Sequence, residues 1–98
     1  MIRLVIALSE QYVLEYLPPG SRNARLDEKK LVQYVREQME ERLSQHFLTP
    51  VQVRVIPGDA TLVRPTGETH PKIREVTEHL LKGVLEITEL DQFVLKPV

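Results

Sequence analysis

The second half of this chain decides its fold, because two short strand patterns there precede one long amphipathic segment. The sequence VQVRVIPGDATLVRPTG covers residues 51–67, and HPKIREVTEHLLKGVLEITELDQFV covers residues 70–94. Valine alternates with polar residues over 51–55, which is the pattern of a half-buried strand. Turn residues follow at 57–59, so we predict that this strand pairs with a second one at 62–63 as a hairpin.

Two segments have the three- and four-residue spacing of apolar residues that is typical of a helix with one buried face. In the later segment, the predicted buried stripe is Ile73, Val76, Leu80, Val84 and Ile87. In the earlier segment, the predicted stripe is Leu31, Val35, Met39, Leu43 and Phe47. Asp27 can cap the earlier helix, because its carboxylate can accept a hydrogen bond from a free amide of the first turn. Pro50 ends that helix at the latest.

The remaining segments complete an α+β pattern of order β-α-β-β-α. Residues 2–8 are apolar almost throughout, which predicts a strand that is buried on both faces or central in a sheet. Residues 9–26 contain a Pro-Pro-Gly break, so we expect a short turn or strand and then an exposed loop. We therefore predict a two-layer sandwich with both helices on one face of a small sheet. Residues 92–97 fit a docked tail or an extra C-terminal strand, which would give a ferredoxin-like variant.

Length and composition fit a single domain over residues 1–98 and argue against several functions. The chain has 13 basic and 14 acidic residues, so it lacks the basic excess of nucleic-acid-binding proteins, and we expect no direct nucleic-acid binding. It has no cysteine, which excludes thiolate chemistry and zinc–thiolate sites. No apolar run has the length of a membrane span, and the opening run is too short for a secretory signal. We therefore expect a cytoplasmic protein that does not contact membranes.

The sequence contains no clear catalytic or metal-binding pattern. Glu75 and His79 are four residues apart, which can place two metal ligands on one helix face, but nothing marks a third ligand. His46 has Arg42, not a ligand, one turn before it. The serines lack a nucleophile elbow, and no glycine-rich phosphate loop is present. We therefore expect a protein that is not an enzyme and needs no metal or cofactor.

The charged residues indicate two candidate binding surfaces. A small basic patch, made of Arg22, Arg25, Lys29 and Lys30, precedes the first long helix. Acidic residues are interleaved with it, so we interpret it as solvated surface. The exposed face of the second long helix and the tail after it have a negative bias. We predict that a partner protein binds there, with carboxylates supplying the charge and one aromatic ring as an apolar anchor: Glu75, Glu78, Glu86, Glu89, Asp91 and Phe93.

Several motifs of this chain resemble those of the DinI-like family (DNA-damage-inducible protein I). The opening MIRLVIAL is similar to the first strand of the family, and residues 17–20, Leu-Pro-Pro-Gly, are similar to its Leu-Pro-x-Gly before the first helix. Residues 51–54 resemble its Val-x-Val-Arg strand, and residues 90–94 resemble its Asp-x-Phe-Val ending. This chain departs from the family in having extra residues before the first helix, and His79 and Lys82 at positions that tend to be acidic.

The resemblance implies a regulator of the DNA-damage (SOS) response in bacteria, phages or plasmids. Family members bind the filament that RecA recombinase forms on single-stranded DNA, and their acidic C-terminal helix is thought to make the contact. Two alternatives stay open: an adaptor or inhibitor of the same fold that binds a phage repressor or a nuclease, and a ferredoxin-like domain that binds a small ligand or nucleic acid. A paired strand at 93–95 would favour the ferredoxin-like domain. A helix through Glu86 with an exposed acidic tail would favour the filament.

Overall fold

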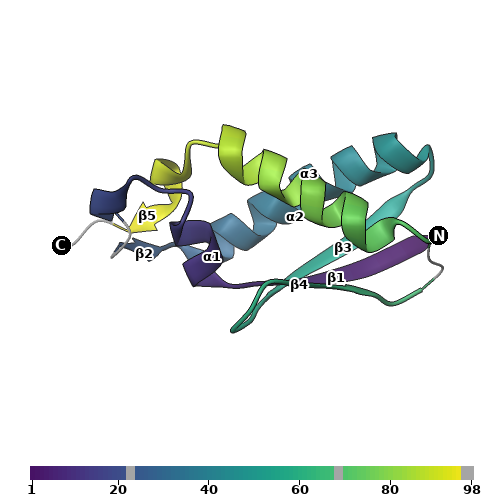
Figure 1. Ribbon diagram of the computed structural model, residues 1–98, viewed down its shortest axis with the longest axis horizontal. Helices are drawn as coiled ribbons and strands as arrows, with labels where there is room; N and C mark the ends of the chain where they lie inside the picture. The colour runs from purple at the N-terminus through teal and green to yellow at the C-terminus, as the bar shows by residue number, and fades with distance from the viewer. Residues whose placement is uncertain (22–23, 68–69, 96–98) are drawn as a thin grey trace.

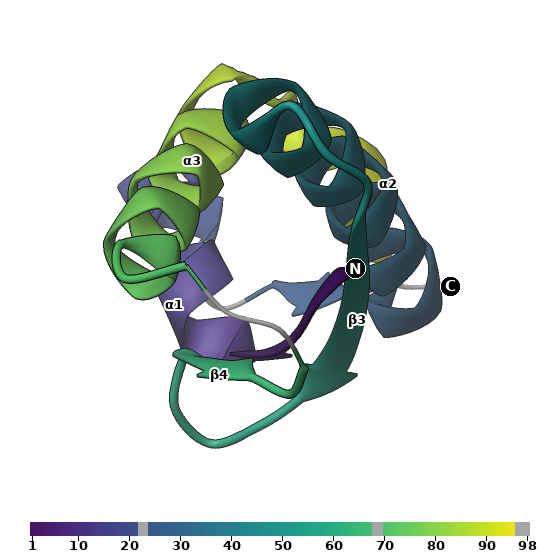
Figure 2. The same cartoon turned by 90° about the vertical axis from the view of Figure 1, so that its right-hand side faces the viewer.

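The computed structural model describes every residue except 22–23, 68–69 and 96–98. Two long helices lie on one face of a three-stranded sheet, and a small two-stranded sheet lies at one end of the molecule (Figures 1 and 2). The molecule is elongated and measures 44 × 23 × 19 Å along its principal axes. The predicted α+β class, with two helices on one face of a small sheet, is confirmed.

The first strand of the chain is the middle strand of the main sheet. Strand β1 (Ile2–Leu8) has β3 (Val51–Pro57) parallel on one side and β4 (Leu62–Pro65) antiparallel on the other. The predicted central position is confirmed, whereas the predicted hairpin is wrong, because β3 and β4 are not neighbours. The turn between them crosses the end of β1, where the Gly58 amide donates to the Leu8 carbonyl at 3.2 Å.

Strand β1 is fully buried on one face only. Its alternate residues from Ile2 to Leu8 face the helices and are buried, whereas Val5 and Ala7 face the other way and are half-buried. Of the two predicted alternatives, burial on both faces and a central position, the structure therefore shows the central position. Both long edges of β1 are paired with neighbouring strands, which satisfies its backbone groups.

Helix α2 (Glu28–Phe47) follows the predicted pattern. The Asp27 carboxylate accepts a hydrogen bond from the Lys30 amide at 3.3 Å and so caps the helix. The buried residues are Leu31, Val35, Met39 and Leu43, while Phe47 is half-buried against the core. The helix ends at Phe47, and the next residue, Leu48, adopts a left-handed conformation with φ of 53°, two residues before Pro50.

Helix α3 (Ile73–Ile87) forms as predicted, but its buried face is rotated. The buried residues are Ile73, Thr77, Leu81, Val84 and Leu85. Val76 and Leu80, predicted as core, are only half-buried, and Ile87 is 68% exposed. Thr77 can be buried because its hydroxyl donates to the Ile73 carbonyl one turn earlier. Of the two apolar pairs, 80–81 and 84–85, the first has only Leu81 fully buried, whereas in the second both Val84 and Leu85 are buried.

The segment between β1 and α2 contains a short helix, α1 (Glu10–Leu14), where we expected a turn or strand. Ser9 caps it by accepting a hydrogen bond from the Tyr12 amide at 3.4 Å. Val13 and Leu17 anchor the segment in the core. The exposed loop that we expected next lies partly at residues 22–23, which are outside the described residues.

The C-terminal strand forms, but it does not join the main sheet. After a 3-10 turn at Leu90–Phe93, β5 (Val94–Leu95) pairs antiparallel with β2 (Arg25–Leu26). Residues 96–97, which we had included in this element, are outside the described residues. The main sheet therefore keeps three strands among the described residues, and the single sheet of a ferredoxin-like variant is not formed.

Both outer edges of the main sheet are protected. On β3, the Ser44 hydroxyl accepts from the Val51 amide at 3.0 Å, and the Glu40 carboxylate accepts from the Val53 amide at 2.9 Å. Strand β4 is short and ends at Pro65, which has no amide hydrogen. These features discourage edge-to-edge pairing with another chain. No helix in the described part of the chain is long and apolar enough to cross a membrane.

Candidate functional site

The five carboxylates of the predicted binding surface are all exposed, but they form two separate groups. Glu75 and Glu78 lie in the first half of α3, close in sequence to Lys72 and Arg74. Eleven residues of helix, about 16 Å, separate Glu75 from the second group. We call this second group the C-terminal acidic group, and it consists of Glu86, Glu89 and Asp91.

One member of the C-terminal acidic group, Glu86, lies where the backbone is already electronegative, and Glu89 and Asp91 follow it at the start of a 3-10 turn. Glu86 is in the last turn of α3, and that turn contains no basic residue. The C-terminal end of a helix carries a partial negative charge from its free carbonyl groups. Among the described residues, none forms an ion pair with these three carboxylates. The end of α3 therefore has a concentrated negative potential.

Phe93 cannot act as the exposed anchor that we predicted. Its side chain is only 5% exposed, and its ring lies 5.4 Å from that of Tyr34 on α2, measured between ring centroids. The Phe93 carbonyl accepts a hydrogen bond from the Asp27 amide at 2.6 Å. Phe93 therefore holds the tail against α2, and in doing so it fixes the position of Glu89 and Asp91.

The histidines lie near one another without forming a metal site. His46, Glu75 and His79 line a hollow of about 400 Å³ between the end of α2 and the start of α3. No group of three metal-ligating side chains is placed to hold an ion in the part of the chain that the structure describes. In the small basic patch, Arg25, Lys29 and Lys30 are exposed, and Arg22 is outside the described residues.

A second surface, which the sequence reasoning missed, is the face of the main sheet opposite the helices. We call it the open sheet face. Strand register arranges nine outward-facing residues in three rows across β3, β1 and β4. From one end of the sheet to the other, the rows are Gln52–Arg3–Thr66, then Arg54–Val5–Arg64, then Ile56–Ala7–Leu62.

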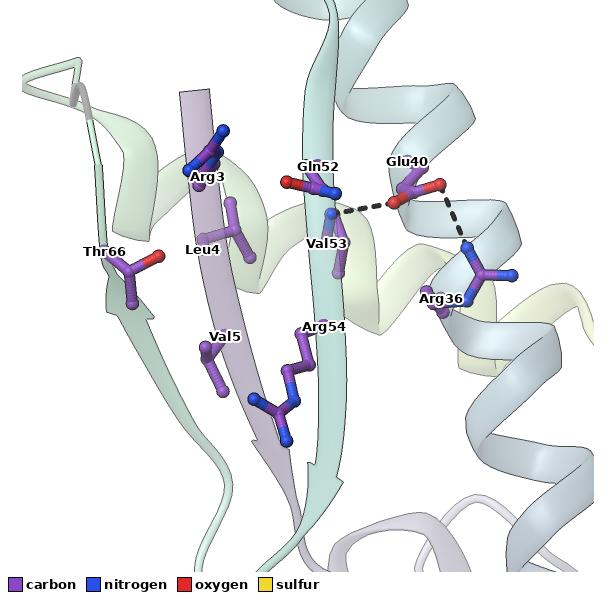
Figure 3. A pocket seen from close by; sticks show the side chains of 9 residues that line it. All are labelled: Arg3, Leu4, Val5, Arg36, Glu40, Gln52, Val53, Arg54 and Thr66. Atoms are coloured by element: carbon purple, nitrogen blue, oxygen red, sulfur yellow. Dashed lines mark hydrogen bonds and ion pairs between the residues drawn. The ribbon is translucent and has the colours of Figure 1, made fainter. Parts of the chain in front are cut away.

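The open sheet face is basic at one end and apolar at the other. Arg3, Arg54 and Arg64 are exposed, and none of them forms an ion pair or a side-chain hydrogen bond with any described residue. The charge of Arg36, at the margin, is offset by Glu40, whose carboxylate lies 3.2 Å from its guanidinium and also binds the Val53 amide (Figure 3).

Two adjoining hollows follow this face. One, of about 550 Å³, includes Arg3 and extends over β3 to α2 (Figure 3). The other, of about 310 Å³, includes the apolar row. They share Val5, Arg54 and Thr66, so the hollowed surface is continuous. The alternating pattern of β3 alone indicated that Arg54 points outward, but only the strand order shows that it lies beside Val5 and Arg64.

Comparison with known proteins assigns no family to this chain. No protein-family model, curated protein or solved structure matches it. A function must therefore be inferred from the fold and from these two surfaces of opposite charge.

Proposed function

We propose that this protein is a non-enzymatic regulator that binds another protein through the C-terminal acidic group, and that its partner is the RecA filament on single-stranded DNA. The observation that carries the proposal is the placement of three exposed carboxylates at the negative end of α3. An acidic residue in the last turn of a helix, as Glu86 is, typically costs about 0.3–1 kcal/mol of stability. Stability therefore does not explain Glu86, whereas recognition of a basic groove does.

The fold and the resemblance support the same partner. The strands of the main sheet and the two long helices follow one another as β1-α2-β3-β4-α3, which is the β-α-β-β-α pattern predicted beside the DinI-like resemblance. The resemblance also attributes RecA contact to an acidic C-terminal helix. Helix α3 extends through Glu86, and in the docked segment after it the side chains of Glu89 and Asp91 are exposed. A paired strand at 93–95 was the feature that favoured a ferredoxin-like domain. The strand that forms, at 94–95, pairs with β2 and, among the described residues, adds no strand to the main sheet.

The test is co-sedimentation with RecA filaments assembled on single-stranded DNA. The variant Glu86→Lys/Glu89→Lys should bind at least about tenfold more weakly, equivalent to about 1.4 kcal/mol, because two attractive contacts become repulsive. Wild-type binding should also weaken as salt increases. The matched control is Lys29→Glu/Lys30→Glu, which reverses two exposed charges at the start of α2 and should retain binding. Both variants should melt close to wild type, since exposed substitutions seldom change stability by more than about 0.5 kcal/mol.

Two results would contradict the proposal in different ways. If wild-type protein fails to sediment with filaments at low salt, the partner is wrong, and a repressor or a nuclease becomes the partner to test. If binding occurs but the Lys29/Lys30 reversal is the damaging one, RecA is the partner and the assigned surface is wrong.

A further inference from the structure

We propose that the open sheet face binds an acidic amphipathic helix of a protein partner, at a site separate from the C-terminal acidic group. The protein would then have two binding surfaces of opposite charge. This proposal rests on the sheet alone and does not require the RecA assignment.

The three arginines of this face are arranged around one apolar residue. Arg54 and Arg64 flank Val5 in a single row, and because neighbouring strands lie about 4.8 Å apart, their Cα atoms are about 10 Å from each other. Arg3 is two residues from Val5 along β1, or about 6.6 Å. No described residue pairs with these guanidinium groups, so they are available to bind partner carboxylates, with which arginine forms bidentate hydrogen bonds.

The opposite end of the face supplies apolar contact. Ile56, Ala7 and Leu62 form the third row, and Leu62 is 60% exposed. A sheet face that is simply solvated has polar residues along its whole length. Here the residues along the strands change from basic to apolar. This change indicates a ligand that has acidic groups at one end of its contact surface and apolar groups at the other.

A helix fits the dimensions of this surface. The three rows extend from Arg3 to Ala7 of β1, four residue steps or about 13 Å, which is the length of about nine helical residues. A helix along β1, with apolar side chains over the third row and carboxylates over the other two rows, would match both ends. It would also cover the second face of the sheet and so form a third layer of secondary structure.

Two other occupants fit the face less well. A second copy bound through the same face would bring two sets of arginines together, and like charges repel. Single-stranded nucleic acid is usually bound by stacking its bases on aromatic rings, and none of the nine residues in the three rows is aromatic.

The experiment uses a fluorescein-labelled synthetic helical peptide with leucine at positions i and i+1 for the apolar row and glutamate at i+4, i+5 and i+8 for the two rows with arginine. Fluorescence anisotropy should show binding to the wild-type protein that weakens with salt. The variant Arg54→Gln/Arg64→Gln should bind at least about tenfold more weakly, because each lost charge-assisted hydrogen bond contributes substantially. The matched control, Arg25→Gln, removes an exposed arginine of the small sheet and should bind like wild type. Glu86→Lys/Glu89→Lys should also bind like wild type, which separates this site from the RecA proposal.

Several results would overturn the inference. One is equal affinity of wild type and Arg54→Gln/Arg64→Gln for the peptide, provided that both have the same melting temperature. Another is undiminished binding of a control peptide with glutamine in place of every glutamate. Tighter binding of a labelled oligothymidine that depends on the same arginines would assign the face to nucleic acid. Concentration-dependent dimerisation that the arginine variant abolishes would assign it to a second copy.

Discussion

The rotated face of α3 gives a sharp test of the fold, because Leu80 and Leu81 are adjacent and chemically identical. Leu81 is 1% exposed, whereas Leu80 is half-buried at the margin of the core. Leu81→Ala removes buried methyl groups and leaves a cavity, so we expect a cost of about 2–5 kcal/mol. Leu80→Ala loses only part of the transfer free energy, and water can fill the space, so we expect about 1–2 kcal/mol.

Urea denaturation followed by circular dichroism measures this difference. With a urea m-value of about 2 kcal/mol/M, a loss of about 3 kcal/mol lowers the midpoint by about 1.5 M. Leu80→Ala should lower the midpoint by about half as much. The control is Ile87→Ala, at a side chain that is 68% exposed, which should change stability by no more than about 0.5 kcal/mol. If Leu80→Ala proves as costly as Leu81→Ala, or Ile87→Ala proves costly, the assigned face of α3 is wrong.

Two further predictions concern the β3 edge and the α1 segment. Glu40→Ala removes the acceptor of the Val53 amide. Amide hydrogen exchange at Val53 should therefore become faster, and the free energy of unfolding should fall by about 1–3 kcal/mol. Unchanged exchange would show that this hydrogen bond does not protect the β3 edge. Burial, together with the hydrogen bond to the Tyr16 hydroxyl, raises the pKa of Tyr12. The unfolded chain then loses this proton at a lower pH than the folded one, so stability should decline above about pH 10. The melting temperature of Tyr12→Phe should fall less than that of wild type as the pH rises above about 10. An identical fall would show that Tyr12 is not responsible for the loss of stability.

The sequence predicted the parts of the fold that depend on local patterns. The stripe of α2 from Leu31 to Leu43 and the Asp27 cap were both correct, because spacing and capping are local properties. The rotation of α3 was missed because Thr77 counted as polar, although its hydroxyl is satisfied within the helix. The hairpin was wrong because the order of strands depends on long-range pairing, and a turn of the right length can also cross the end of a third strand.

The candidate surfaces were likewise predicted only where they depend on local sequence patterns. The exposure of the carboxylates on α3 followed from its polar face, and it was predicted correctly. The burial of Phe93 was not predicted, because its aromatic contact, Tyr34, is on a helix distant in sequence. Arg3 is about fifty residues from Arg54 and about sixty from Arg64, and the three come onto one face around Val5 when β1 is placed between β3 and β4. Only a tertiary structure could identify that cluster.

The central position of β1 has a consequence for folding during synthesis. Its register partners, such as Val51 for Ile2 and Pro65 for Leu4, are translated about fifty to sixty residues later. At about 5–20 residues per second, this apolar strand waits several seconds on the ribosome before either edge can pair. Local helices such as α2 need no such delay, and long-range pairings of this kind slow the search for the native topology. The nascent chain is therefore most exposed to aggregation, and most in need of chaperone protection, in the interval before β3 and β4 emerge.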